Sequence, residues 1–244
     1  MKTRSICCRG KEGLSDPRGS IGALVERWLG VALGWHAEIQ EGRISVRVIG
    51  FNASPRKGGN TATVVEAVLK GAAAKGAETQ LVNLNRLDMK CCQGCDGCKK
   101  NLGHCVQRDD LSPLLEELPR FDAIVLGTPI YWFHVNAQFK TLIDRLYCFY
   151  GFDTDAETGD TKETIAFPEG KKFVVVTSRG DPEDKPMVPQ LYDYLNEWLN
   201  VVGMAMGASS VEFIHHYGSL NAKDSARSDV ELLARAESVG ASLV

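Results

Sequence analysis

The 244-residue sequence lacks the features that would place it in several large classes of protein. It contains no run of about 18 apolar residues, the length that a membrane-spanning helix needs, so no membrane span is expected. It has no block of Lys and Arg and carries a net charge of −3, so nucleic acid is not expected as a partner. Residues 1–19 lack the apolar stretch of a secretory signal, so we expect a cytoplasmic protein whose thiols stay reduced.

Familiar phosphate-binding and hydrolytic motifs are also absent. Neither the Walker A pattern G-x-x-x-x-G-K-[ST] nor the dinucleotide pattern G-x-G-x-x-G occurs. No cysteine stands at the nucleophile position of a tyrosine-phosphatase loop. No Ser/His/Asp or paired-carboxylate constellation emerges, so the sequence does not indicate hydrolysis and we assign no catalytic side chain.

From residue 44 onward, the sequence alternates between apolar strands and amphipathic helices. The predicted strands are 44–50, 79–84, 121–129, 171–180 and 209–217. The predicted helices are 61–76, 109–120, 136–150, 189–203 and 225–243. Apolar strands between helices indicate a parallel sheet that is covered on both faces. We therefore predict an α/β fold, a flavodoxin-like doubly wound sheet of five parallel strands, with ligands beyond the carboxyl ends of the strands. Gly203 is expected to provide a left-handed cap for its helix.

Two segments fall outside this alternation. Residues 1–43 form a predicted N-terminal extension, helical in part, before a domain of residues 44–244. A helix in the extension is expected to pack on the domain or at a subunit interface, since the basic face of a membrane-surface helix is missing. A native start near Arg43 is an alternative. The acidic stretch 153–163 is predicted to be a solvated insertion or, alternatively, a lid.

The segment GFNASPRKGGNT, residues 50–61, joins the first predicted strand to the first predicted helix. It offers hydroxyl, guanidinium and amide donors, and glycines that allow the backbone to approach an anion closely. The candidate phosphate ligands are Ser54, Arg56, Gly59, Asn60 and Thr61. The alternative is a plain glycine-rich turn in which Asn60 or Thr61 caps the helix.

The pattern S-x-R-x-x-x-N-T at 54–61 resembles the FMN phosphate loop of the NADPH-dependent FMN reductase family. The stretch TPIYWFHVNAQFKTLIDRLY, residues 128–147, is similar to that family's flavin-ring loop and the helix after it. The resemblance implies bound FMN, with ring contacts from Pro129, Ile130, Tyr131 and Trp132 and a third contact from Ser178 and Gly180. Lys140, Asp144 and Arg145 are interpreted as structural, with Lys140 paired to Asp144 one helical turn away.

Five of the eight cysteines lie in the loop 91–105, CCQGCDGCKKNLGHC. The spacing C-x2-C-x2-C-x6-C selects Cys92, Cys95, Cys98 and Cys105 as metal ligands. Zinc knuckles usually stand further apart, whereas a compact run of thiolates suits an iron–sulfur cubane. A zinc site and a cluster-free thiol loop remain alternatives, and Cys91 offers a competing register.

The cysteine pattern resembles the compact motif of the iron–sulfur flavoproteins, which hold a 4Fe-4S cluster beside FMN. Because the loop follows the second strand, we expect it near the flavin, and we expect Cys148 to be an unrelated buried thiol. The resemblance implies electron transfer from NAD(P)H or a ferredoxin-type donor, through FMN and the cluster, to a small-molecule or protein acceptor. It also implies a homodimer or homotetramer. The alternatives are a cluster-free NAD(P)H-dependent FMN or quinone reductase, and a zinc- or flavin-containing binding module without turnover.

Overall fold

The computed structural model describes residues 45–220 and 222–244, and Ser45–Val244 form one compact unit. The predicted extension of residues 1–43 lies outside the described residues. No helix of the described part is long and apolar enough to cross a membrane.

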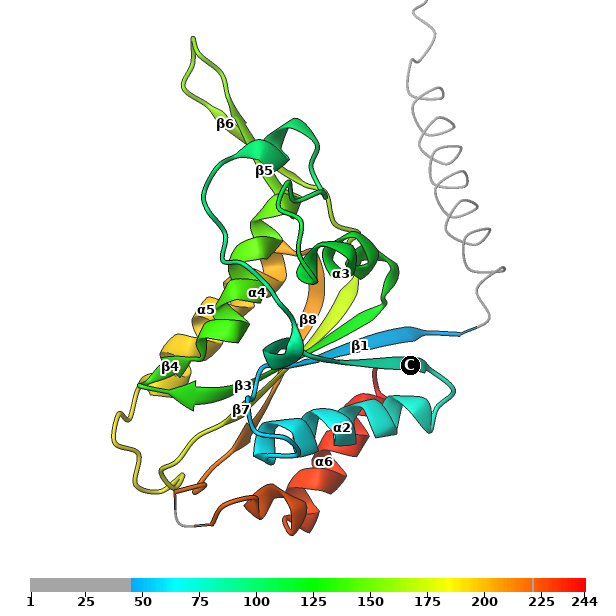
Figure 1. The fold of residues 1–244 in the computed structure, drawn as a ribbon, viewed down its shortest axis with the longest axis vertical. Helices are drawn as coiled ribbons and strands as arrows, with labels where there is room; N and C mark the ends of the chain where they lie inside the picture. The colour runs from blue at the N-terminus through cyan, green and yellow to red at the C-terminus, as the bar shows by residue number, and fades with distance from the viewer. Residues whose placement is uncertain (1–44, 221) are drawn as a thin grey trace, which may run out of the picture. The chain divides into compact units, whose positions relative to one another are not determined.

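A five-stranded parallel sheet forms the centre of the unit, as predicted (Figure 1). Its strand order is β2-β1-β3-β7-β8, the order of a flavodoxin-like sheet. The strands are β1 (Arg47–Asn52), β2 (Glu78–Asn83), β3 (Ala123–Tyr131), β7 (Lys171–Ser178) and β8 (Ala208–His216). A short strand, β4 (His134–Val135), pairs antiparallel with the end of β3 and was not predicted.

Helices cover both faces of the sheet (Figure 1). One face carries α2 (Asn60–Ala73) and α6 (Val230–Ala241). The other face carries α3 (Leu111–Glu117), α4 (Ala137–Arg145) and α5 (Leu191–Ala205). Short 3-10 turns span Leu84–Arg86, Gly97–Lys100, Leu118–Arg120, Leu146–Phe149 and Ser225–Arg227.

Alternate residues of β3 build the two cores. Val125 packs into the core under α2 and α6, and Leu126 packs into the core under α3, α4 and α5. Both side chains are buried because successive residues of a strand point to opposite faces. This explains why the strand is apolar throughout rather than alternately apolar and polar.

Two glycines let α2 and α6 approach until their backbones touch. A Cβ atom on Gly71 would lie 2.0 Å from the carbonyl oxygen of Glu237, and one on Gly240 would lie 1.9 Å from that of Val68. No other residue leaves this space free, so the packing of α2 on α6 depends on both positions.

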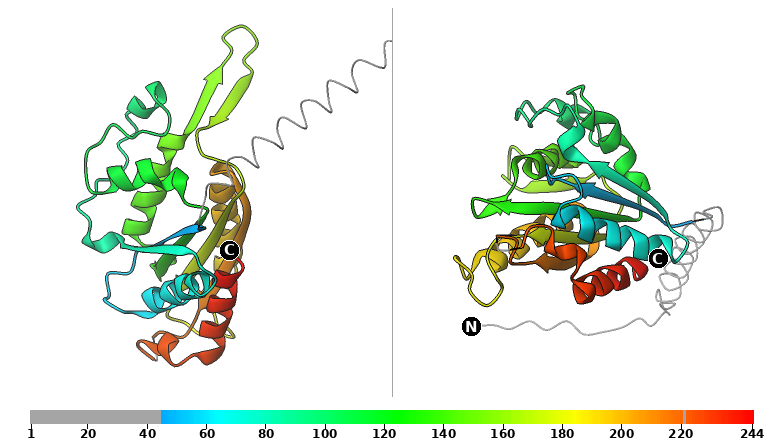
Figure 2. Two further views of the ribbon diagram at one scale, coloured as in Figure 1. Left: turned by 90° about the vertical axis from the view of Figure 1, so that its right-hand side faces the viewer. Right: turned by 60° about the horizontal axis from the view of Figure 1, so that its bottom comes forward.

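Two sequence expectations need correction. Gly203 is not a helix cap, because α5 continues to Ala205, and the left-handed residue is Gly207, with a φ of +67°. The acidic stretch is exposed, as expected, but it is a regular hairpin of β5 (Tyr150–Thr154) and β6 (Thr161–Ile165). The hairpin projects from the rest of the unit (Figures 1 and 2).

Candidate functional site

The predicted phosphate loop lies between β1 and the start of α2, at the carboxyl edge of the sheet. The backbone N–H of Ser54 donates to Asn52 Oδ1 at 3.1 Å, and the Ser54 hydroxyl accepts from the backbone N–H of Arg56 at 3.3 Å. Gly59 occupies the N-cap of α2, so neither Asn60 nor Thr61 caps the helix. Ser54, Arg56 and Gly59 thus lie in the loop before α2, and Asn60 and Thr61 are its first two residues, where the helix N-terminus has free N–H groups.

The C-terminal part of the chain closes over this loop, which the sequence did not indicate. Arg56 forms an ion pair with Asp224, and Arg227 donates to the carbonyl oxygen of Gly58 at 2.7 Å. Asn60 Oδ1 accepts from the backbone N–H of Ala226 at 3.1 Å. Within the described residues the buried Nδ2 of Asn60 has no hydrogen-bond partner. An unpaired buried donor at a helix N-terminus fits a phosphate oxygen.

The predicted flavin-ring loop is a tight hairpin between β3 and β4. Tyr131 pairs with His134, so Trp132 and Phe133 form a two-residue turn in which both have positive φ, 48° and 63°. Such turns favour glycine and asparagine, and bulky residues in them are strained. The side chain of Trp132 is 92% exposed, and Tyr131 and Phe133 are exposed beside it. A strained turn that presents three aromatic rings fits the face of a flat ligand such as a flavin, and the sequence did not single out Phe133.

Asn136 joins the two loops. Its Oδ1 accepts from the backbone N–H of Phe139 at 3.2 Å and so caps α4, while its Nδ2 donates to the carbonyl oxygen of Ala53 at 2.6 Å. Asn136 is 3% exposed. The sequence did not mark this residue, although an Asn before a helix is a recognisable cap signal.

The predicted third contact lies at the end of β7. The Ser178 hydroxyl is 3.0 Å from Nδ1 of His216, so its side chain is engaged with β8. A Cβ atom on Gly180 would lie 2.5 Å from Leu220, which covers that glycine. A flavin contact at this loop stays a prediction.

The four predicted metal ligands come together in space. Cys92, Cys95, Cys98 and Cys105 line one cavity of about 20 Å³. Cys148 also lines this cavity, so the prediction that it is unrelated to the site was wrong. Cys148 is nevertheless a buried thiol, as expected, and burial raises its pKa to about 12.

Among the described residues, no three Cys, His, Asp or Glu side chains are grouped as they would be around one ion. A cubane takes one thiolate on each iron, so its ligands stand further apart than those of one zinc ion. Gly94 and Gly103 have φ values of +60° and +88°, which let the loop turn around a shared centre.

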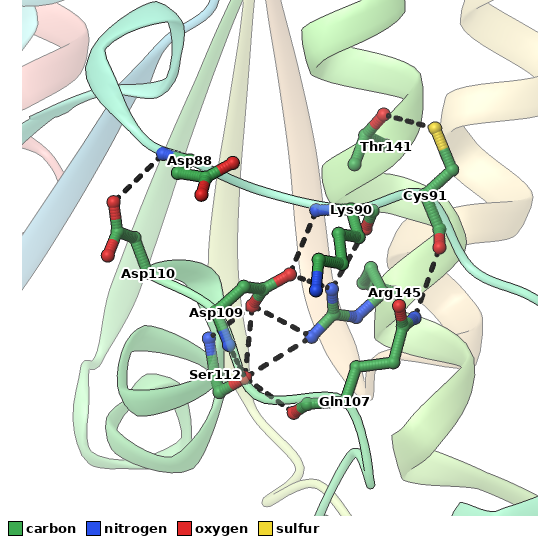
Figure 3. Close-up of polar contacts among 9 residues, drawn as sticks. All are labelled: Asp88, Lys90, Cys91, Gln107, Asp109, Asp110, Ser112, Thr141 and Arg145. Carbon is green, nitrogen blue, oxygen red and sulfur yellow. Dashed lines mark hydrogen bonds and ion pairs between the residues drawn. The ribbon is translucent and has the colours of Figure 1, made fainter.

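Cys91 lies outside the cysteine cavity. Its Sγ is 3.4 Å from the hydroxyl of Thr141 on α4 (Figure 3), whereas the neighbouring Cys92 lines the cavity. The four cysteines of the register that starts at Cys92 line the cavity, and Cys91 is not among the lining residues.

The cysteine loop is closed at its neck by contacts between residues that enter and leave it (Figure 3). The Lys90 backbone N–H donates to Asp109 Oδ2 at 2.9 Å, and Gln107 Nε2 donates to the Cys91 carbonyl oxygen at 3.1 Å. Arg145 of α4 binds both sides: it donates to the Lys90 carbonyl oxygen at 2.9 Å and to the Asp109 carboxylate at 2.6 and 3.2 Å. A buried ion pair thus fixes the neck.

Hydrogen bonding keeps the buried Asp109 ionised. Burial alone would raise the pKa of its carboxyl group, but hydrogen bonds from Arg145, the Lys90 amide and Ser112 hold that pKa well below its ordinary value. The predicted pair of Lys140 with Asp144 on the same helix is confirmed.

Helix α4 separates the cysteine loop from the phosphate loop of the same chain. The segment after β2 runs along α4: Asn85 contacts Gln138 at 3.2 Å, Cys91 contacts Thr141, and Lys90 contacts Arg145. The phosphate loop meets the opposite end of α4, at Asn136. The nine residues of α4 span about 13 Å, and the expected closeness of the cysteine loop to the flavin stays a prediction.

A larger apolar cavity adjoins the cysteine cavity. It has a volume of about 900 Å³ and lies between α4, the C-terminal half of α5 and the projecting hairpin. Cys92 and Tyr147 line both cavities. The carboxylates of Asp144 and Glu163 are the acidic groups on its wall.

Comparison with known proteins agrees with these features. Residues 46–215 match the NADPH-dependent FMN reductase family. An iron–sulfur flavoprotein of Archaeoglobus fulgidus is 32% identical over 168 residues, which are 69% of this chain and 69% of that protein. An iron–sulfur flavoprotein of Methanocaldococcus jannaschii is 39% identical over 100 residues, which are 41% of this chain and 51% of that protein.

Solved structures share the fold at low sequence identity. An NAD(P)H:quinone oxidoreductase from Methanothermobacter marburgensis superposes with a TM-score of 0.59 at 19% identity, covering 82% of this chain and 97% of its own. An FMN-dependent NADH-azoreductase from Bacillus anthracis gives a TM-score of 0.58 at 14% identity, covering 81% and 97%. With the family match over residues 46–215, these findings establish that the chain belongs to the NADPH-dependent FMN reductase family, on the branch of the iron–sulfur flavoproteins, and is an FMN-dependent oxidoreductase.

Proposed function

We propose that this oxidoreductase passes electrons between FMN and a 4Fe-4S cluster held by Cys92, Cys95, Cys98 and Cys105. The observation that carries the proposal is the convergence of these four thiols on one cavity. When bound, FMN exchanges electrons in pairs or singly and the cluster exchanges them singly, so the two together connect two-electron and one-electron reactions. The donor is NAD(P)H or a ferredoxin-type protein, and the acceptor is a small molecule or a protein.

The chain's part in this reaction is to bind and orient FMN. Ser54, Arg56, Gly59, Asn60 and Thr61 hold the phosphate, with Asn60 Nδ2 free to donate. Pro129, Ile130, Tyr131 and Trp132 hold the ring, and Ser178 and Gly180 form the third edge of the site. The Asn136–Ala53 hydrogen bond keeps the phosphate and ring loops at a fixed separation. The protein works as a homodimer or homotetramer.

Absorption spectroscopy with metal analysis tests the proposal. Protein purified without oxygen is expected to show flavin bands and a broad shoulder near ~400 nm, with about four irons and four sulfides per chain. A Cys95→Ala variant is expected to lose iron and sulfide while keeping FMN. Flavin without iron or sulfide in the unaltered protein would refute the cluster, and failure to bind added FMN would refute the whole proposal.

The second candidate is a cluster-free NAD(P)H-dependent FMN or quinone reductase. Two observations favour it: the cysteine cavity of about 20 Å³ holds little more than one water unless the loop opens, and the apolar cavity of about 900 Å³ is large enough for an aromatic acceptor. Steady NAD(P)H oxidation with a quinone by iron-free protein supports this candidate. Reduction of the flavin by ferredoxin but not by NAD(P)H supports the first.

A further inference from the structure

Arg145 is buried more completely than any other charged group at the cysteine loop. The side chains of Arg145 and Asp109 are 0% and 2% exposed, and the guanidinium binds the carboxylate through two nitrogens. Burying a charged pair is costly, and such a pair does not by itself stabilise a fold more than apolar side chains do. The position of this pair therefore calls for another explanation.

One N–H of the guanidinium is left without a partner at the cysteine cavity. Its two terminal nitrogens are used by Asp109, the Lys90 carbonyl oxygen and Ser112. Its Nε is buried and has no hydrogen-bond partner among the described residues. Arg145 lines the same cavity as Cys105.

Cys105 lies near this guanidinium in the lining of the cavity. Burial lowers the pKa of Arg145, but hydrogen bonding to Asp109 and the nearby sulfur of Cys105 outweigh burial, so the pKa is raised overall. A cation that is always charged, held by Asp109 in one orientation, thus lines the same cavity as Cys105, one of the predicted cluster ligands.

We propose that Arg145 is the positioning residue of the cysteine cavity: it holds the exit of the loop so that Cys105 faces the other three thiols, and it donates an N–H to the Cys105 sulfur. This inference rests on the proposed function, because it concerns a residue that acts on a cluster ligand. Hydrogen bonds to cluster sulfurs, and positive charge near them, stabilise the reduced cluster and raise its reduction potential. Arg145 therefore makes the cluster easier to reduce.

The test compares two variants with a matched control. Arg145→Lys keeps the buried charge that neutralises Asp109 but removes the fixed Nε–H. The double variant Arg145→Gln with Asp109→Asn removes both charges and leaves no unpaired buried carboxylate. Lys140→Gln removes an exposed cation of the same helix that is paired with Asp144 and does not line the cavity. Iron, sulfide and FMN contents, circular dichroism and the reduction potential of the cluster are measured for each.

We expect both Arg145 variants to hold about tenfold less reduced cluster at a fixed potential than the unaltered protein, which is a shift of about 59 mV for one electron. The Lys140→Gln protein is expected to match the unaltered one. Loss of iron from a variant that keeps its fold and its FMN also supports the positioning role. An intact cluster whose potential is unchanged in both variants overturns this inference and leaves the proposed function standing. Unaltered protein without iron and sulfide overturns both.

Discussion

The side-chain amide of Asn136 donates to the carbonyl oxygen of Ala53 across 2.6 Å and so joins the loop after β1 to the start of α4. The same side chain caps α4 by accepting from Phe139. One buried residue thus both caps α4 and fixes the distance between the two loops that are proposed to hold FMN.

Replacing Asn136 by Ala is expected to lower both stability and FMN affinity. The variant loses a helix cap and leaves the Ala53 carbonyl oxygen without its donor, which together cost about 2 kcal/mol. Chemical denaturation measures the stability, and fluorescence titration measures FMN binding. Asp229→Ala is the control, because Asp229 caps α6 by accepting from Leu232 at 2.9 Å but lies outside the FMN loops. FMN affinity that falls no further in Asn136→Ala than in Asp229→Ala would contradict the coupling.

If Arg56 binds the FMN phosphate as proposed, Asp224 competes with FMN for its guanidinium. Because the ion pair is partly exposed, it is weak, and replacing Asp224 by Asn is expected to strengthen FMN binding by up to about fivefold. Asn suits the left-handed backbone at this position, where φ is +66°, so the turn is kept. The dissociation constant of FMN checks this. Glu237→Gln is the control, since it removes an acidic residue of α6 that is paired with Lys70 and not with Arg56. An unchanged or weaker affinity in Asp224→Asn would show that Arg56 does not reach the phosphate.

The sheet could be predicted because each strand carries its own signal. Segments such as FDAIVLGTP are apolar throughout, and only a strand buried on both faces requires this. Strands that follow one another in sequence tend to be neighbours, and connections between parallel strands are right-handed. These two rules allow only a few strand orders for a five-stranded sheet. The end of α5 could not be predicted in the same way, because a glycine inside a helix and a glycine that caps one look the same in sequence. Gly203 is inside α5, where it packs against Val211.

The course of the cysteine loop could not be predicted, because it depends on contacts between distant parts of the chain. The sequence pattern predicts that Asp109 begins a helix, but its carboxylate binds Arg145, 36 positions away in the sequence. Cys148 lines the cysteine cavity because it lies in the 3-10 turn that follows α4. Its distance in sequence from Cys105 matches no metal-binding motif, so the sequence could not place it there. Asp224 and Arg227, in the segment before α6, contact the phosphate loop about 170 positions earlier in the chain, and no local sequence pattern encodes such contacts.

Gly71→Ala is expected to destabilise the protein, although alanine is the better helix former. Alanine in place of glycine inside a helix usually gains about 1 kcal/mol. Here the new methyl group would lie 2.0 Å from the Glu237 carbonyl oxygen, so α2 and α6 must separate, at a net cost of about 1–3 kcal/mol. Chemical denaturation measures whether the free energy of unfolding falls or rises in the variant. Gly240→Ala should behave alike, and a gain in stability for either variant would show that the two helices are not in backbone contact.

The protein is expected to lose stability as the pH falls from about 6.5 toward 4, in part through His215. Burial, with nearby Arg235 and Arg179, lowers the pKa of His215 to about 4, whereas the unfolded chain titrates near 6.5. Between these values the unfolded state takes up a proton that the folded state does not, so acid favours unfolding. The free energy of unfolding at about pH 7 and about pH 5 measures this, and the difference should be smaller in His215→Gln. Equal pH dependence in the two proteins would exclude His215 as a contributor.

Adjacent cysteines provide the sharpest test of the cluster register. Cys91 contacts Thr141 on α4 and lies outside the cysteine cavity, whereas Cys92 lines it beside Cys95, Cys98 and Cys105. Cys92→Ala is therefore expected to lose iron and sulfide and to keep FMN, and Cys91→Ala is expected to keep all three. The two variants make the same chemical change one residue apart, so general damage to the loop affects both alike. Iron, sulfide and flavin contents of protein purified without oxygen give the result. Loss of iron from Cys91→Ala with retention in Cys92→Ala would move the ligand register by one residue, and retention in both would remove this loop as the cluster site.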